Sequence, residues 1–187
     1  MKKILLFASG TGSNVENIIQ YFKNHHDIFV VGVFTNNPHA KVLEKAKKYD
    51  VPTFIFNNEE LSKGFVLDKI AELKPDLIVL AGFLWKMPEQ IVAIYPNKII
   101  NIHPALLPKY GGKGMYGMNV HNAILGNKEK ETGITIHYVN ENYDEGEFIF
   151  QKKVNIEDCA SADEIAAKIN ELEHKHFPEI IERLLDH

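Results

Sequence analysis

Residues 98–108 read KIINIHPALLP, and this stretch decides the fold. Its isoleucines are β-branched and apolar, which predicts a strand buried on both faces of a sheet. Side chains alternate along a strand, so Asn101 and His103 project to the same side. Pro104 cannot donate a backbone hydrogen bond and disfavours helix at the residue before it, so the strand should end there. An amide and an imidazole therefore meet at the C-terminal end of a buried strand, where open α/β sheets bind their ligands.

A structural interpretation of the same two residues has to be weighed. A single histidine in an apolar run is more often a hydrogen-bonded core residue than a functional one. With Asn101 nearby and a Pro-x-x-x-Pro pattern following, the structural and functional interpretations of His103 are about equally well supported. The rest of the chain has to decide between them.

The composition bounds the class of protein. The chain has 187 residues, of which 45% are hydrophobic and 25% charged, and this fits one domain with a full core. A net charge of −4 argues against general nucleic-acid binding, which usually needs a basic surplus. The single cysteine, Cys159, excludes an internal disulfide and fits a reducing compartment. The apolar run at residues 4–7 is too short for a signal peptide or a membrane span. We therefore expect one cytoplasmic domain over residues 1–187, with no membrane or nucleic-acid partner.

A small-residue turn, SGTGSN at residues 9–14, follows a predicted strand over 2–8 and precedes apolar residues at helical spacing. We expect Ser13 or Asn14 to cap that helix. Glycines let the backbone approach a ligand, and the free amides of a helix start favour an anion. Val15 stands where a dinucleotide-binding turn needs its third glycine, so the pattern favours a phosphate monoester. The alternative is an ordinary tight turn between strand and helix.

Strands and helices alternate along the chain. Further strands are predicted over 28–34, 52–56 and 77–81, and helices over the residues after Pro38 to about 48, 60–73 and 88–95. This alternation predicts an α/β fold, a single-domain doubly wound, mostly parallel sheet with helices on both faces. Apolar runs at 133–139 and 147–154 predict an antiparallel C-terminal part. A long last helix should start at Ser161 or Asp163, and Pro178 should kink or split it.

Three candidate features fall at C-terminal strand ends, namely SGTGSN, GFLWKM at residues 82–87 and NIHP at residues 101–104. In a parallel sheet these ends share one edge, so the three features should line one pocket. His137 lies inside a predicted strand and is expected to be a structural histidine. The nine histidines are scattered, and no metal site is predicted.

With these residues in view, the chain resembles the phosphoribosylglycinamide formyltransferase family. The matching motifs are SGTGSN, LAGF at 80–83, NIHPALLPKY at 101–110, GITIHYV followed by DEG at 144–146, and ELEH at 171–174. They span nearly the whole chain. The similar methionyl-tRNA formyltransferase carries an extra C-terminal domain and formyltetrahydrofolate hydrolase an extra N-terminal one, and we expect neither in residues 1–187.

The resemblance implies direct transfer of a formyl group from 10-formyltetrahydrofolate, as co-substrate, to the amine of glycinamide ribonucleotide, the third step of de novo purine biosynthesis. It implies that His103 polarises the formyl oxygen and donates a proton. Asn101 would hydrogen-bond the developing oxyanion, and Asp144 would orient His103 and keep it protonated. The physical logic is consistent, because fixed donors at a developing oxyanion are worth about 3–4 kcal/mol each.

The resemblance also implies the binding residues. Gly12, Ser13 and Asn14 would hold the phosphate, and Glu173 the ribose hydroxyls. The folate would lie against the turn at 140–144 and the side chains of Leu84, Trp85, Lys86, Met87 and Asn101, with Lys63 at its tail. Two departures from the family pattern lie on the folate side. Trp85 and Lys86 stand where the family often has an Arg, and the loop 111–117 is longer than the usual form.

Two other functions remain open at this point. Formyl transfer to the amine of a nucleotide-linked sugar would use Asn101, His103 and Asp144 but would not need a phosphate-monoester loop. A non-catalytic phosphate- or nucleotide-binding module would need SGTGSN but not the three polar residues. The sequence does not fix the oligomeric state, and a homodimer is compatible with it.

Overall fold

A computed structural model of the chain describes residues 1–186. Within them the strands form one seven-stranded sheet of order β3-β2-β1-β4-β5-β6-β7. The strands are β1 Lys2–Phe7, β2 Ile28–Thr35, β3 Thr53–Ile55, β4 Leu77–Leu80, β5 Ile99–His103, β6 Glu131–Tyr138 and β7 Phe148–Asn155. The first five pair in parallel, β6 pairs antiparallel with β5, and β7 pairs antiparallel with β6. This confirms the predicted doubly wound sheet with an antiparallel C-terminal part.

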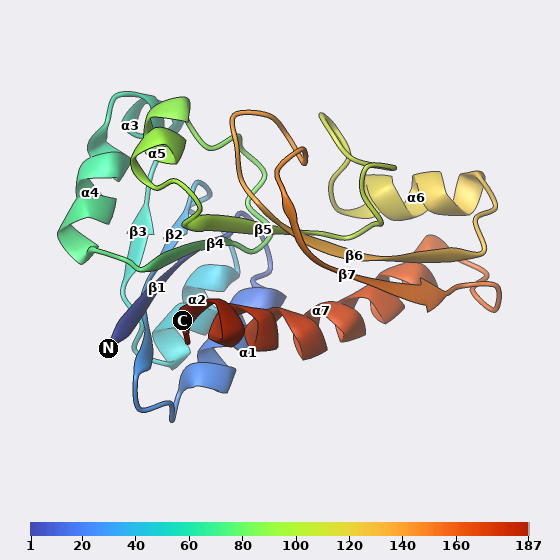
Figure 1. Cartoon of the computed structure of the whole chain (residues 1–187), viewed down its shortest axis with the longest axis horizontal. Helices are drawn as coiled ribbons and strands as arrows, with labels where there is room; N and C mark the ends of the chain where they lie inside the picture. The colour runs from blue at the N-terminus through green and yellow to red at the C-terminus, as the bar shows by residue number, and fades with distance from the viewer. Residues whose placement is uncertain (187) are drawn as a thin grey trace.

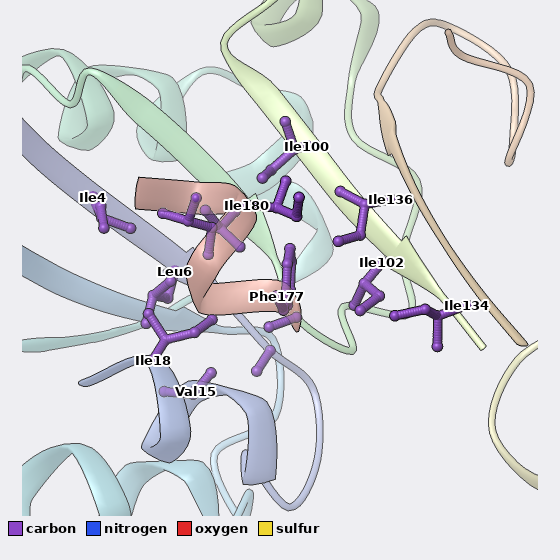
Figure 2. Packing of buried hydrophobic residues seen from close by; sticks show 14 of the residues in the cluster. Ile4, Leu6, Val15, Ile18, Ile100, Ile102, Ile134, Ile136, Phe177 and Ile180 are labelled. Carbon is purple, nitrogen blue, oxygen red and sulfur yellow. The ribbon is translucent and has the colours of Figure 1, made fainter. Parts of the chain in front are cut away.

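Helices cover both faces of the sheet (Figure 1). They are α1 Ser13–Phe22, α2 Val42–Lys48, α3 Asn58–Ser62, α4 Phe65–Leu73, α5 Glu89–Ile94, α6 Met118–Gly126 and α7 Ala162–Leu185. One buried apolar cluster joins α1, α2, α6 and α7 to one face, and Figure 2 shows part of it around Phe177 and Ile180. A second cluster joins α3, α4 and α5 to the other face. The sheet is therefore buried between two cores, as the continuous apolar strands predict.

The central strand β5 divides its side chains between these two cores. Ile100 and Ile102 belong to the first cluster and Ile99 to the second. Because side chains alternate along a strand, Asn101 and His103 project to the side opposite Ile100 and Ile102. Asn101 pairs with Leu80 of β4 on one edge and with His137 of β6 on the other.

The predicted cap of α1 is wrong. Gly12 occupies the N-cap position in a left-handed conformation, with φ at 71°, and neither Ser13 nor Asn14 caps the helix with its side chain. A Cβ at Gly12 would lie 2.4 Å from Cγ2 of Val42. The glycine is therefore required by its backbone conformation and by the close approach of α2, and the Ser13 and Asn14 side chains are left free for other contacts.

The helix predicted over 60–73 is two helices. Asn57 caps α3 through a capping box with Glu60, so the helical segment begins earlier than predicted. Gly64 then takes a φ of 95° and the chain starts again as α4. The glycine that interrupts the apolar pattern is thus the site of the break.

Ser161 caps the long helix α7, as predicted, but Pro178 does not split it. A proline removes the donor to the carbonyl four residues earlier, here that of His174. Nδ2 of Asn17 on α1 donates to that carbonyl at 2.8 Å. A side chain of a neighbouring helix therefore replaces the missing backbone donor. No helix within residues 1–186 has the length and apolar character needed to cross a membrane.

Candidate active site

A cleft of about 770 Å³ runs along the C-terminal ends of β1, β4 and β5. All three features predicted for this edge contribute to its wall, together with the loops after β5 and β6 and one side of α7. The lining includes Thr11, Ser13, Asn14, Leu80, residues 82–87, residues 101–104, residues 112–118, His121, His137, residues 142–144 and Glu173. Ser9 links two of these loops, since its amide donates to the Gly82 carbonyl at 3.0 Å and its hydroxyl accepts from the Leu84 amide at 3.0 Å.

His103 lies buried in the cleft wall, and both of its ring nitrogens face polar groups. Nε2 donates to the backbone carbonyl of Tyr110 at 2.7 Å. Nδ1 lies 3.6 Å from Oδ2 of Asp144. Burial lowers the pKa of His103 below its ordinary value, against the opposing effects of Asp144 and the Tyr110 carbonyl. The lowered pKa favours the neutral form of the imidazole, and the proximity of Asp144 favours the protonated form that the sequence analysis assigned to it.

Asp144 lies between His103, His137 and the Gly112 amide at this end of the cleft. Its Oδ2 accepts from the Gly112 amide at 3.0 Å, and its Oδ1 lies 3.6 Å from Nε2 of His137. Burial alone would raise the pKa of Asp144, but its surroundings, which include the hydrogen bond from the Gly112 amide, hold this pKa below its usual range. The carboxylate is thus ionised at neutral pH and stays next to His103. Gly146 brings the turn close, because a Cβ there would overlap the Tyr138 carbonyl.

Sequence reasoning treated His137 only as a structural histidine, but the structure places it in the cleft wall. Its Nδ1 donates to the Tyr138 carbonyl at 2.9 Å, which leaves Nε2 as an acceptor for Nδ2 of Asn101 at 3.1 Å. His137 therefore orients the Asn101 amide. The antiparallel register of β5 and β6 puts the two residues opposite each other. This register, which the sequence analysis did not predict, is what would have identified His137 as a site residue.

The far end of the cleft holds a second buried carboxyl group. Nδ2 of Asn14 donates to Oε2 of Glu173 at 2.9 Å. Both side chains are buried, and burial raises the pKa of Glu173 to about 7, although the Asn14 contact opposes the shift. Oδ1 of Asn14 is buried and has no hydrogen-bond partner among the described residues. This pair offers a buried acceptor and a protonatable carboxyl group to a polar ligand.

The third part of the cleft has a mixed apolar and aromatic wall. Leu84, Trp85 and Met87 line the cleft, together with Lys86 and the turn at 142–144. The Trp85 ring packs on Phe56 with centroids 6.3 Å apart, and Nζ of Lys86 lies 5.9 Å from the centroid of the Tyr143 ring. A flat aromatic ligand suits such walls.

Two of the residues predicted for the site do not line the cleft. Lys63 pairs with Glu59 at 2.6 Å. Val42 fills the space that a side chain at position 12 would need, so Gly12 can offer a ligand only its backbone. The other predicted residues, Ser13, Asn14, Glu173, Asn101, His103, Asp144 and residues 84–87, share the cleft. Among residues 1–186, no group of three or more His, Cys, Asp or Glu side chains is placed to hold a metal ion.

The chain is similar to known proteins over its whole length. The formyl transferase family profile matches residues 2–181. The phosphoribosylglycinamide formyltransferase of Bacillus subtilis (strain 168) is 35% identical, covering 99% of this chain and 95% of the relative. A chloroplastic phosphoribosylglycinamide formyltransferase from Vigna unguiculata is 34% identical over 99% of this chain, but the chain spans only 61% of that relative's length.

Solved structures agree with this similarity. The crystal structure of glycinamide ribonucleotide transformylase 1 from Geobacillus kaustophilus has a TM-score of 0.90 and 31% identity, covering 99% of each chain. The phosphoribosylglycinamide formyltransferase of Bacillus halodurans has a TM-score of 0.89 and 33% identity, covering 98% of this chain and 95% of the other. Sequence, fold and the composition of the cleft thus agree, and the chain belongs to the formyl transferase family, among the phosphoribosylglycinamide formyltransferases.

Proposed function

We propose that the protein transfers a formyl group directly from 10-formyltetrahydrofolate to the amine of glycinamide ribonucleotide in purine biosynthesis. The observation that carries this proposal is the cleft itself. One part of the cleft presents Asn101, His103 and Asp144 together, and the two other parts differ in character. An aromatic and apolar wall suits the pterin of the folate, and the Asn14–Glu173 end suits a ribose phosphate.

The catalytic roles follow from the contacts of each side chain. The substrate ammonium has to lose a proton before its nitrogen can attack the formyl carbon. His103 receives that proton at Nδ1, which faces ionised Asp144 at 3.6 Å. After the amine nitrogen has bonded to the formyl carbon, it loses its second proton to water. The imidazolium then donates its proton to the folate nitrogen as the bond between that nitrogen and the formyl carbon breaks. This order agrees with the lowered pKa of His103 and keeps His103 as the proton donor.

Asn101 stabilises the negative charge that develops on the formyl oxygen. One hydrogen of its amide is committed to His137, and this contact fixes the amide plane before the substrate arrives. Asn101 lines the cleft, and the remaining amide hydrogen is the donor that we assign to the formyl oxygen. Asp144 stabilises the positive charge on His103 after the proton is taken up, so the buried imidazolium has an ion-pair partner.

The binding roles are assigned by region. The SGTGSN turn, through the backbone of Gly12 and the side chains of Ser13 and Asn14, takes the phosphate at the start of α1. Glu173 takes the ribose hydroxyls. Leu84, Trp85, Lys86, Met87 and the turn at 140–144 take the folate, and Lys63 is left as a contact for the folate tail. We also propose that the protein acts in the cytoplasm; its oligomeric state is left open.

A formyl-transfer assay tests this proposal. Glycinamide ribonucleotide and 10-formyltetrahydrofolate are mixed with the protein, and release of the deformylated folate is followed spectroscopically beside a tube without acceptor. Release that depends on the acceptor supports the proposed reaction. Release without acceptor indicates a hydrolase and contradicts it. If neither tube reacts, the assay is repeated with a nucleotide-linked amino sugar as acceptor. If no folate is released with that acceptor either, the function as a non-catalytic binding module remains.

A further inference from the structure

The segment Tyr110–Gly112, here called the strap, touches both members of the candidate catalytic pair. The Tyr110 carbonyl accepts from Nε2 of His103 at 2.7 Å, and the Gly112 amide donates to Oδ2 of Asp144 at 3.0 Å. A carbonyl can only accept, so the contact with Tyr110 requires a hydrogen on Nε2. In a neutral imidazole this leaves the lone pair on Nδ1, the nitrogen that faces Asp144.

The strap has a backbone conformation that needs support. Tyr110 takes a φ of 57° and Gly112 a φ of 93°. A residue with a Cβ is disfavoured in the left-handed region, so something outside the peptide backbone has to hold Tyr110 there. Without that conformation the Tyr110 carbonyl would not be aimed at His103.

The Tyr110 side chain supplies an anchor outside the cleft. Its hydroxyl donates to Oε1 of Glu129 at 2.8 Å and accepts from Nδ2 of Asn127 at 2.9 Å. Asn127 is the C-cap of α6, and the Glu129 amide is bonded to the Ile124 carbonyl of the same helix. Tyr110, Asn127 and Glu129 do not line the cleft, so none of them is placed to touch a substrate there.

We infer that Tyr110 is a positioning residue whose hydroxyl, anchored on Asn127 and Glu129, holds the strap so that its carbonyl fixes the tautomer of His103. The consequence for the reaction is specific. Nδ1 is kept free of hydrogen and pointed at Asp144, ready to take the substrate proton. This catalytic consequence depends on the proposed function, whereas control of the tautomer does not.

The test compares Tyr110→Phe with Tyr21→Phe. Tyr21 is a matched control, because its hydroxyl also donates to a glutamate, Glu182, and the residue does not line the cleft. Nitrogen-15 NMR of the histidine rings reports the tautomer, with the His103 signals identified by their loss in His103→Gln. Wild type and Tyr21→Phe should show Nε2 protonated and Nδ1 unprotonated. Tyr110→Phe should shift both nitrogens toward the values of a tautomer mixture.

Kinetics give the second readout. Losing one hydrogen bond that acts on the catalytic pair should lower kcat about five- to tenfold in Tyr110→Phe, with KM for the nucleotide unchanged. Glu129→Ala should show the same change in smaller degree, and Glu129→Gln, which keeps an acceptor oxygen for the phenol, should restore kcat. Glu129 is only partly buried, so its variants should fold. Glu129→Ala and Glu129→Gln therefore replace Tyr110→Phe in the test if Tyr110→Phe does not fold.

A His103 spectrum in Tyr110→Phe that matches Tyr21→Phe overturns the inference, whether or not kcat falls. The same holds for Glu129→Ala where Tyr110→Phe is unfolded. If the wild type transfers no formyl group at all, the proposed function fails, but the ring spectra still decide whether Tyr110 controls the tautomer.

Discussion

The two ends of the cleft each bury a carboxyl group, and they treat it in opposite ways. Asp144 has the Gly112 amide, His103 and His137 around it, and its pKa is held below the usual range. Among residues 1–186, Glu173 has the Asn14 amide as its one hydrogen-bond partner, and burial raises its pKa to about 7. At the Asp144 end, the protein's own groups surround the carboxylate and keep it ionised, so we call this the completed end. At the Glu173 end, the carboxyl group has few polar partners in the protein, so we call this the incomplete end; such a region suits a ligand that brings its own polar groups.

The strongest test of this contrast removes the imidazole at the completed end. His103→Ala should reduce kcat by about 10²- to 10⁴-fold, because the proton acceptor and donor is lost. His26→Ala is the matched control, since His26 is exposed and does not line the cleft. Both variants should unfold at the wild-type temperature within a few degrees. The formyl-transfer assay described above measures the effect, and full activity in His103→Ala would refute the mechanism.

The incomplete end should show itself in the pH dependence of stability. The pKa of Glu173 is about 7 in the folded protein, against 4.5 for an ordinary glutamate. The folded state therefore keeps its proton at pH values where the unfolded state has lost it, and the free energy of unfolding should fall as the pH rises from 4.5 through 7. The loss is on the order of 3 kcal/mol relative to Glu173→Gln, which has no titratable group there.

Denaturant unfolding of the wild type and Glu173→Gln at pH 4, 6 and 8 measures this difference. The burial of His103 acts in the opposite sense, because its lowered pKa removes stability as the pH falls through 6.5, and it is common to both proteins. Parallel stability curves for the two proteins would show that Glu173 is ionised in the folded state and would remove the contrast between the two ends.

A third test separates binding from chemistry. Glu173→Ala removes the buried carboxyl group from the nucleotide end and leaves the Asn14 amide without its partner. We expect KM for the nucleotide to rise about tenfold, the size of one or two hydrogen bonds, with kcat unchanged. Steady-state kinetics with varied nucleotide measures both values. A fall in kcat with unchanged KM would place Glu173 in the chemistry instead, and the two ends would then not have separate roles.

The sequence predicted the architecture because strand and helix periods are local signals. The apolar runs gave the order of strands and helices, and the spacing of two between Asn101 and His103 placed both side chains at one strand end. Convergence of three strand ends on one cleft followed from the general properties of parallel sheets. These features do not depend on which distant residues meet.

The errors came from residues whose role depends on a distant neighbour. Gly12 is fixed by Val42 of α2, so a local capping rule selected the wrong residue. His137 joins the site only through the register between β5 and β6. The sequence also gave no prediction for the Tyr110 hydroxyl, which contacts Asn127 and Glu129 across an intervening helix. Register and inter-element contacts are set by the whole packing arrangement, and one sequence does not contain them as a local pattern.

The smallest expected effect concerns how the Glu173 end is held in place. Pro178 leaves the carbonyl of His174, the residue next to Glu173 in the chain, without its helical donor. Nδ2 of Asn17 donates to that carbonyl at 2.8 Å instead. Asn17→Ala should lower the free energy of unfolding by about 1 kcal/mol, the net value of one hydrogen bond. In a Pro178→Ala background the helix regains its own donor, so the same change should cost much less. A double-mutant cycle from urea unfolding measures this coupling. Equal costs in both backgrounds would mean that Asn17 does not compensate for the proline, and that this contact does not help to hold the Glu173 end of the cleft.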